Sequence, residues 1–321
     1  MNSAMNKPLL FYRCLAKDVF DKKILRKTIS YKNLSSHIGN RKMLSPLETH
    51  TLIANAIQQN RPFFVGRLGG YELSAMIQYL EHRLTLNAPV TKHLIHNAGL
   101  FNIRQTTLEQ FARLYFQSCG ELDIIGRHWN GMENYVISAY APKAKITDMF
   151  FIEPYFPNVE SVWTKSLQGK NVLVIHPFEN SIQRQYQKRT LLFENPDILP
   201  EFHLITLKAV QTIGNNSDNR FSDWFEALDY MYQKAMQYDF DVALVGCGAY
   251  GFPLSAKLKQ QGKTVIHLGG ALQILFGIKG KRWETLPDFD YVRNLFNDNW
   301  IYPSKEETVS GADSIENGCY W

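Results

Sequence analysis

Short apolar runs recur along the chain and alternate with longer segments in which apolar residues return every three or four positions. Runs of the first kind are typical of buried strands, and segments of the second kind are typical of helices that cover a core with one face. The predicted strands are 62–67, 122–126, 144–152, 171–175, 202–207, 242–245 and 264–268, and the predicted helices are 45–59, 71–81, 107–118, 182–193, 222–237 and 253–261. This alternation predicts an α/β fold with a mainly parallel sheet and helices on both faces.

The turn after the strand 242–245 has the pattern G-x-G-x-x-G and leads directly into a helix. Glycines at Gly246, Gly248 and Gly251 let the backbone turn tightly and approach an anion closely, while free N–H groups and the positive end of the helix face that anion. Together with Tyr250, they form the predicted nucleotide-binding loop of a Rossmann-like unit. A tight turn without a ligand would have the same pattern, and Tyr250 would then be a core aromatic.

The charge that follows this loop bears on which nucleotide it favours. An NAD site of this type has an acidic residue about 20 positions beyond the glycines, and this residue binds the ribose hydroxyls. No acidic residue occurs in 242–283, and the stretch is rich in lysine. Within this stretch, the other residues predicted to bind the nucleotide are His267, Gly269, Gly270, Lys281 and Arg282. A nucleoside diphosphate or a phosphosugar therefore fits better than NAD.

A second strand-to-helix turn follows the strand 171–175. His176 stands at the strand end, and Ser181 can cap the following helix. Arg184 and Lys188 on that helix can clamp a phosphate, which arginine does with two parallel hydrogen bonds. We predict that these four residues also contribute to the donor site. The alternative is a solvated basic helix face and a histidine that is hydrogen-bonded to the backbone.

Charge and cysteine content exclude several classes of protein. The 321 residues carry 35 basic and 30 acidic side chains, and the net charge of +5 is too small for a dedicated nucleic-acid binder. The four cysteines have no paired spacing, so neither a zinc site nor a disulfide framework is predicted. There is no run of about 18 apolar residues and no signal-peptide pattern. We therefore predict a cytoplasmic protein.

The chain begins with a basic segment. Residues 1–42 carry ten Lys or Arg against two acidic residues, and apolar positions from Leu9 to Leu25 recur at roughly helical spacing. A basic amphipathic helix of this kind can rest on anionic lipid at the inner membrane face, or it can be a solvated arm packed on the domain. The predicted parts are a basic helical extension at 1–44, an N-terminal α/β half at 45–165 and a C-terminal Rossmann-like half at 166–321.

The turn after the strand 62–67 places Arg67, Gly69, Gly70 and Glu72 together. It resembles the R-F-G-D-G-E-L segment of bacterial GT-D fold glycosyltransferases, in which an Asp-x-Glu pair helps to hold a divalent metal and the sugar nucleotide. Arg67, Gly69, Glu72 and Leu73 match that segment. The resemblance implies a GT-D-like fold and donor-binding roles for Arg67, Gly69 and Gly70.

The sequence departs from that pattern at Gly70, where the family has an aspartate. Glu72 is then the remaining carboxylate of the pair, and one carboxylate with diphosphate oxygens and water holds Mg²⁺ or Mn²⁺ only weakly. The sequence therefore requires no cofactor. The sequence leaves three roles open for Glu72: it is a metal ligand, a catalytic base, or a residue that binds a sugar hydroxyl.

The second half of the chain is similar to proteins from bacterial capsule and O-antigen gene clusters. The stretches that carry this similarity are 176–178, 181–189, 248–254, 267–273, 276–283 and 318–321. It extends over most of the chain from about residue 60. It implies surface-polysaccharide biosynthesis, in which a sugar is transferred from a nucleotide-sugar donor to a glycan or polyprenyl-linked acceptor. A UDP-sugar is the donor expected before others.

Glycosyl transfer needs stabilisation of the diphosphate leaving group and usually a base for the acceptor hydroxyl. The candidate bases are Glu72, Asp123 at a strand start and Glu153 at a strand end, although Asp123 and Glu153 could equally cap a turn or pair with an arginine. Two other functions stay open. They are an NAD(P)-dependent sugar-nucleotide modifying enzyme, suggested by the glycine pattern, and a non-catalytic nucleotide-binding subunit of an assembly complex, suggested by the missing aspartate.

Overall fold

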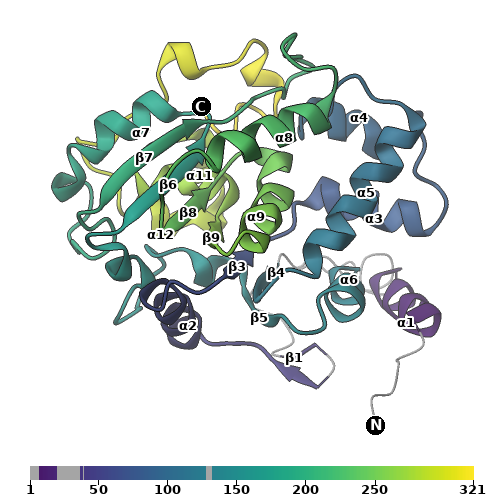
Figure 1. The fold of residues 1–321 in the computed structure, drawn as a ribbon, viewed down its shortest axis with the longest axis horizontal. Coiled ribbons are helices and arrows are strands. Elements are labelled where there is room, and N and C mark those ends of the chain that lie inside the picture. The colour runs from purple at the N-terminus through teal and green to yellow at the C-terminus, as the bar shows by residue number, and fades with distance from the viewer. Residues whose placement is uncertain (1–6, 20–36, 39, 128–131) are drawn as a thin grey trace.

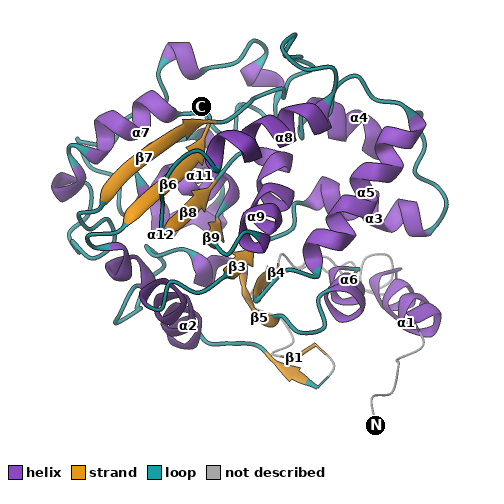
Figure 2. Cartoon of the chain, viewed as in Figure 1, coloured by secondary structure: helices purple, strands orange, loops and turns teal. Residues whose placement is uncertain are grey.

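The computed structural model describes residues 7–19, 37–38, 40–127 and 132–321. Within them, seven strands form one sheet in the order β5-β4-β3-β9-β8-β6-β7, and every neighbouring pair is parallel (Figures 1 and 2). The strands are β3 (Phe63–Gly66), β4 (Ile124–Arg127), β5 (Lys145–Asp148), β6 (Asn171–His176), β7 (His203–Lys208), β8 (Val242–Val245) and β9 (Thr264–His267). The predicted α/β fold with a mainly parallel sheet is confirmed.

The inner strands are apolar on both faces because a core lies on each side of the sheet. In β8, Val242 and Leu244 pack into one core, whereas Ala243 and Val245 pack into the other. Alternate residues of a strand point to opposite faces, so a strand that is covered twice reads as a continuous apolar run. This is why the sequence pattern locates the strands well.

Helices cover both faces of the sheet, as predicted (Figure 1). One face carries α1 (Lys7–Val19), α3 (Gly70–Leu80), α4 (Pro89–His96), α5 (Gln105–Cys119), α6 (Glu133–Tyr140), α8 (Trp224–Ala235) and α9 (Gly251–Gln260). The other face carries α2 (Pro46–Gln58), α7 (Glu179–Tyr186), α10 (Leu272–Leu275), α11 (Lys281–Thr285) and α12 (Asp290–Arg293). A short antiparallel pair, β1 (His37–Ile38) and β2 (Arg41–Lys42), lies outside the main sheet.

Local capping explains where several elements begin and end. Ser45 and Glu48 form a capping box at the start of α2: Glu48 N–H donates to Ser45 Oγ at 3.2 Å, and Ser45 N–H donates to the Glu48 carboxylate at 2.7 Å. The predicted strand 144–152 is too long, because Asp148 Oδ1 accepts the N–H of Phe150 at 2.9 Å and turns the chain into a 3₁₀ helix. Helices α4 and α6 were not predicted.

The strands from the two predicted halves join in one sheet. β3 pairs with β9 along Phe63–Val65 and Thr264–Ile266, so residues about 200 positions apart lie side by side. At the N-terminus, α1 packs on α6, where the rings of Phe11 and Tyr135 meet edge to face at 5.0 Å. The predicted continuation of the basic helix to Leu25 lies outside the described residues.

The first glycine of the glycine-rich turn is required by packing. A Cβ at Gly246 would lie 2.6 Å from the carbonyl oxygen of Gly269 and 2.9 Å from both His176 and Leu272. We expect Gly246→Ala to lower the free energy of unfolding by about 1–3 kcal/mol, because neither the backbone nor two packed side chains can give way cheaply. Urea denaturation measures this loss.

Gly70→Ala is the matched control. A Cβ at Gly70 would meet no atom within 4 Å, and the residue begins helix α3, where alanine is favoured. We expect the control to be neutral or stabilised by less than about 1 kcal/mol. Equal losses in the two variants would contradict the packing argument.

Candidate functional site at the carboxyl edge of the sheet

The parallel sheet gathers five strand-to-helix turns at one edge. Since all strands point the same way, the turns after β3, β9, β8, β6 and β7 follow one another across that edge. They begin at Arg67, Leu268, Gly246, Pro177 and Ala209. Most of the residues predicted from separate motifs therefore lie along this one edge of the sheet.

Strands β8 and β6 are neighbours whose turns diverge to opposite faces of the sheet. β8 leads to α9 on one face, and β6 leads to α7 on the other. Ligands of open α/β sheets bind in the crevice that such a divergence creates. A pocket lies here, and we call it the glycine-loop pocket. It is lined by Asn97, Ala98, His176, Pro177, Phe178, Val210, Gln211, Thr212, Ile213, Gly246, Cys247, Gly248, Tyr250, Gly270, Gln273 and Tyr320.

The glycine loop offers unused backbone donors to this pocket. Gly248 has a φ of +57° and is exposed at the tip of the turn. Cys247 and Gly248 line the pocket, and their N–H groups have no acceptor among the described residues, whereas Gly246 N–H donates to Ile175 O at 2.9 Å. Two free donors next to the start of α9 form a favourable place for an anion.

His176 is a neutral donor in the same pocket. Its Nδ1 accepts the N–H of Phe178 at 3.0 Å, so the proton of the neutral ring lies on Nε2. Burial lowers the pKa of His176 to about 3. The ring therefore offers an uncharged N–H to a ligand at neutral pH.

The remaining walls of the pocket mix apolar and polar side chains and carry no carboxylate. The side-chain carbonyl oxygens of Asn97 and Gln273 have no hydrogen-bond partner in the described structure. Tyr250 stacks on Trp224 with ring centroids 4.7 Å apart, and its hydroxyl lies 2.9 Å from Thr212 Oγ1. Buried polar atoms without partners are uncommon, so these two oxygens indicate a hydroxylated ligand or ordered water.

His267 lies beneath the glycine loop and does not line the pocket. A Cβ at Gly251 would stand 2.7 Å from His267 Nε2, so the third glycine lets α9 lie directly on this ring. Burial and the neighbouring Arg67 lower the pKa of His267 to about 3. In this structure, His267 supports the loop from below.

The start of α7 is already occupied by a carboxylate of the protein. Glu307 accepts the N–H groups of Asn180 at 2.7 Å and Ser181 at 3.2 Å, and it also binds the hydroxyls of Ser181 and Ser304. Ser181 was predicted as the helix cap and a donor ligand, but its side chain binds Glu307. Helix α7 therefore starts at Glu179, earlier than the predicted residue 182.

The predicted clamp on α7 lies away from the glycine-loop pocket. Arg184 and Lys188 are both exposed, and Arg184 Nη2 donates weakly to Ser181 Oγ at 3.4 Å. Neither side chain lines the pocket. The structure does not bring this pair together with the glycine loop.

Arg67 and Glu153 hold two neighbouring turns together. Arg67 Nη1 lies 3.0 Å from Glu153 Oε1, and Arg67 Nη2 donates to the carbonyl oxygen of Leu268. The Tyr291 hydroxyl donates to Glu153 Oε2 at 2.6 Å. The Glu153 side chain is only 1% exposed, so it acts here as the buried counter-ion of Arg67.

Glu72 lies in the first turn of α3, and its side chain folds back over Gly69. A Cβ at Gly69 would overlap the Glu72 carboxylate, so a larger residue there would displace this side chain. Burial and the nearby Glu316 carboxylate raise the pKa of Glu72 to about 7, although its own N–H opposes this shift. A carboxyl group with such a pKa can donate or accept a proton at neutral pH.

Asp123 lies at the opposite edge of the sheet. It precedes β4, accepts the N–H of Phe64 at 2.8 Å and forms an ion pair with Lys259 at 2.9 Å. In a parallel sheet, the residue before a strand is a full strand length from the carboxyl edge. The structure does not bring Asp123 together with Glu72.

Lys281 and Arg282 contact the C-terminal segment, which lies over this edge. Arg282 forms an ion pair with Glu316, and its guanidinium lies 4.9 Å from the centre of the Tyr320 ring. The Lys281 side chain is exposed, and its N–H donates to Trp321 O at 3.2 Å. The ring of Tyr320 in turn fills the space above Gly270.

Several residues of this edge were missed by sequence analysis. They are Asn97, Gln273, Glu307 and Tyr320. The first two are single amides without a motif. Glu307 binds a turn more than 120 positions earlier, and no local spacing reports such a contact. Residues 318–321 had been marked as part of a similar stretch, but not as part of the site.

No protein-family model and no curated protein matches this chain. Two solved structures are similar to it: a domain of unknown function, DUF1792, described as having a distinct glycosyltransferase fold, and a selenomethionine-substituted structure of DUF1792. Each is 14% identical, with TM-scores of 0.39 and 0.38. The matched regions cover 72% and 73% of this chain and 79% of each of those chains.

The raised pKa of Glu72 predicts a pH-dependent stability. The folded state holds the proton up to about pH 7, whereas an unfolded glutamate releases it near pH 4.5. Glu72 therefore does not lower the free energy of unfolding below pH 4.5. Between pH 4.5 and 7 its contribution becomes steadily more unfavourable, and above pH 7 it lowers the free energy of unfolding by a constant amount of about 3 kcal/mol. Glu72→Gln removes this penalty, so it should gain stability over the unsubstituted protein at pH 8 but not at pH 4.5. Urea denaturation at both pH values measures the difference, and a difference independent of pH would contradict the prediction.

Glu307 should contribute strongly to stability. Glu307→Ala leaves two backbone N–H groups and two hydroxyls without their acceptor, so we expect a loss of about 2–4 kcal/mol in the free energy of unfolding. Glu306→Ala is the matched control, because its side chain is exposed, and it should change stability by less than about 0.5 kcal/mol. Chemical denaturation compares the two, and similar small effects would show that Glu307 is not an anchor.

Proposed function

We propose that this protein is a glycosyltransferase of bacterial surface-polysaccharide biosynthesis. It would transfer a sugar from a nucleotide-sugar donor to a glycan or polyprenyl-linked acceptor. A UDP-sugar is the first candidate donor. The observation that carries the proposal is the glycine-loop pocket, which combines two free backbone N–H groups with walls that lack a carboxylate. Such a pocket suits the diphosphate of a sugar nucleotide.

The chemistry of the pocket supports stabilisation of a leaving group. When the glycosidic bond to the donor breaks, negative charge develops on the diphosphate. The N–H groups of Cys247 and Gly248 and the neutral N–H of His176 are fixed donors for that charge. Because the fold already holds them in place, they need no reorganisation when the charge develops.

Glu72 is the proposed base for the acceptor hydroxyl. It lies on the same edge, on the far side of the turn that contains Gly269 and Gly270. A carboxyl group with a pKa of about 7 is half ionised at neutral pH, so it accepts a proton more readily than an ordinary glutamate. Arg67, held by Glu153, would keep the two turns in register.

The geometry argues against a nicotinamide-dependent enzyme. The strand after the glycine loop, β9, should end on an acidic residue that binds the ribose hydroxyls. It ends on His267, which is buried under α9, and Leu268 follows with its carbonyl oxygen bound to Arg67. The ribose ligand of such enzymes has no counterpart here.

A resident divalent cation does not fit this edge well. Among the described residues, no three metal-binding side chains gather in one place. Glu72 has Glu316 nearby, but Glu316 is paired with Arg282. A Mg²⁺ or Mn²⁺ ion would therefore depend on the donor diphosphate and water for most of its ligands.

Contact with an anionic inner membrane face is part of the proposal. Leu9 and Tyr12 of α1 are 60% and 65% exposed, and Arg13 and Lys17 are exposed on the same helix. Apolar and basic side chains on one exposed face favour adsorption to anionic lipid. No helix in the described part of the chain is long and apolar enough to cross a bilayer.

A panel of nucleotides tests the proposal. We expect a nucleoside diphosphate or its sugar derivative to raise the melting temperature by about 5 °C at a hundredfold excess over its Kd, because binding adds about 2.7 kcal/mol to stability. NAD and NADP should have no effect. His176→Leu should weaken the nucleotide effect, whereas His203→Leu, at the exposed amino end of β7, should leave it unchanged.

Turnover separates a transferase from a binding subunit. Transfer or hydrolysis of the donor sugar should fall at least tenfold in Glu72→Gln while nucleotide binding stays the same. Binding without any turnover would support a non-catalytic subunit. A melting temperature that no nucleotide raises, with or without Mn²⁺, would refute the proposal.

A further inference from the structure

A second and larger cavity adjoins the glycine-loop pocket on the side of β7. It has a volume of about 560 Å³, and it shares Pro177, Val210 and Gln211 with the glycine-loop pocket. The glycine-loop pocket itself offers only about 60 Å³. Pockets that hold drug-sized ligands measure about 300–1,000 Å³, so the larger cavity is the part of the edge with room for a saccharide.

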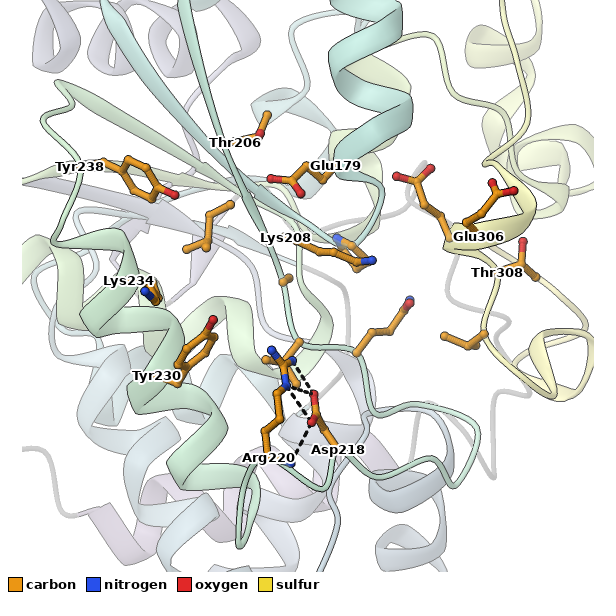
Figure 3. Close-up of a pocket in the computed structure, with 17 residues that line it drawn as sticks. Glu179, Thr206, Lys208, Asp218, Arg220, Tyr230, Lys234, Tyr238, Glu306 and Thr308 are labelled. Carbon is orange, nitrogen blue, oxygen red and sulfur yellow. Dashed lines mark hydrogen bonds and ion pairs between the residues drawn. The ribbon is translucent and has the colours of Figure 1, made fainter.

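The cavity extends to both sides of strand β7. Lys208 ends β7 and, like Thr206, which is bonded to Gln183 of α7, it lies on the α7 side, next to Glu179 (Figure 3). Lys234 and Tyr230 come from α8 on the other side, with Tyr238 just beyond α8. Neither lysine forms an ion pair with a described residue. The unpaired Lys234 beside two tyrosine rings suits an anionic group on a ring-shaped ligand.

The third cation of the cavity is not available for a ligand. Arg220 binds Asp218 with two nearly parallel hydrogen bonds of 2.9 and 2.6 Å, drawn as dashed lines in Figure 3. Its guanidinium also lies 5.6 Å from the centre of the Tyr230 ring. The pair is therefore a neutral part of the cavity wall that helps to orient Tyr230.

The α7 side of the cavity provides hydrogen-bond acceptors. Glu179 at the start of α7 and Glu306 in the C-terminal segment face the cavity, and neither is paired with a described cation. Glu307 is buried and binds the start of α7, so it fixes the segment that carries Glu306 and Thr308. Carboxylates accept hydrogen bonds from sugar hydroxyls, whereas they repel a second anion.

We infer that this cavity binds an acidic saccharide. Its carboxylate or phosphate would lie at Lys234, beside Tyr230, and hydroxyls further along the saccharide would reach Glu179 and Glu306. The residues shared by the two cavities place this ligand next to the glycine-loop pocket. Binding of the acidic saccharide depends on this cavity alone and not on the proposed function.

Matched ligands test the charge requirement directly. The carboxylate arm compares 3′-sialyllactose with lactose and a hyaluronan tetrasaccharide with chitotetraose; the phosphate arm compares glucose 6-phosphate with glucose. Titration calorimetry and saturation-transfer NMR on the full chain should detect at least one acidic member binding at least tenfold more tightly than its neutral partner. The preference should shrink as the salt concentration rises, because the lysines are partly exposed.

Matched variants locate the site. Lys234→Met should weaken the acidic ligand at least fivefold, whereas Lys143→Met, which removes an exposed lysine outside the cavity, should not. Equal binding of acidic and neutral saccharides, no binding of any saccharide, or unchanged binding in the Lys234→Met variant would overturn the inference. Nucleotide-induced stabilisation is measured separately, so a failure here leaves the proposed donor site intact, and a failure there leaves this cavity intact.

Discussion

The parallel pairing of β9 with both β3 and β8 is the interaction on which the rest of the structure depends. It joins residues 63–65 to 264–266 and thereby unites strands from both parts of the chain in one sheet. Because all the strands run in the same direction, the turns that carry polar and glycine residues meet at one edge. The same pairing presses the turns so close together that Gly246 and Gly251 have no room for a side chain.

The C-terminal segment completes that edge. Glu307 is a buried carboxylate, and such a group is costly unless its hydrogen bonds are satisfied. Two backbone N–H groups and two hydroxyls satisfy it, which fixes one register of the segment on α7. From this anchor, Glu306 and Thr308 form a wall of the larger cavity, and Tyr320 closes the glycine-loop pocket above Gly270. One buried carboxylate therefore positions parts of both cavities.

The edge is also divided by charge. The glycine-loop pocket offers uncharged donors, because burial keeps His176 neutral and no carboxylate lines the walls. On one side lies Glu72, whose pKa of about 7 suits proton transfer. On the other side, the larger cavity is lined by both cations and carboxylates.

Local sequence determined the strands, most of the main helices and the glycine turn. A strand with a core on each face must be apolar throughout, and a turn that continues into a helix needs glycine where the backbone is crowded, so both leave a readable local signal. Asp123 could also have been placed correctly, because a residue before a parallel strand lies at the amino edge. Only the tertiary structure decided that β6 and β8 are neighbours, that Glu307 takes the place predicted for a phosphate, and that His267 supports the loop from below. These facts depend on contacts between residues far apart in the chain, and the spacing of residues within a segment carries no information about which distant segment will pack against it.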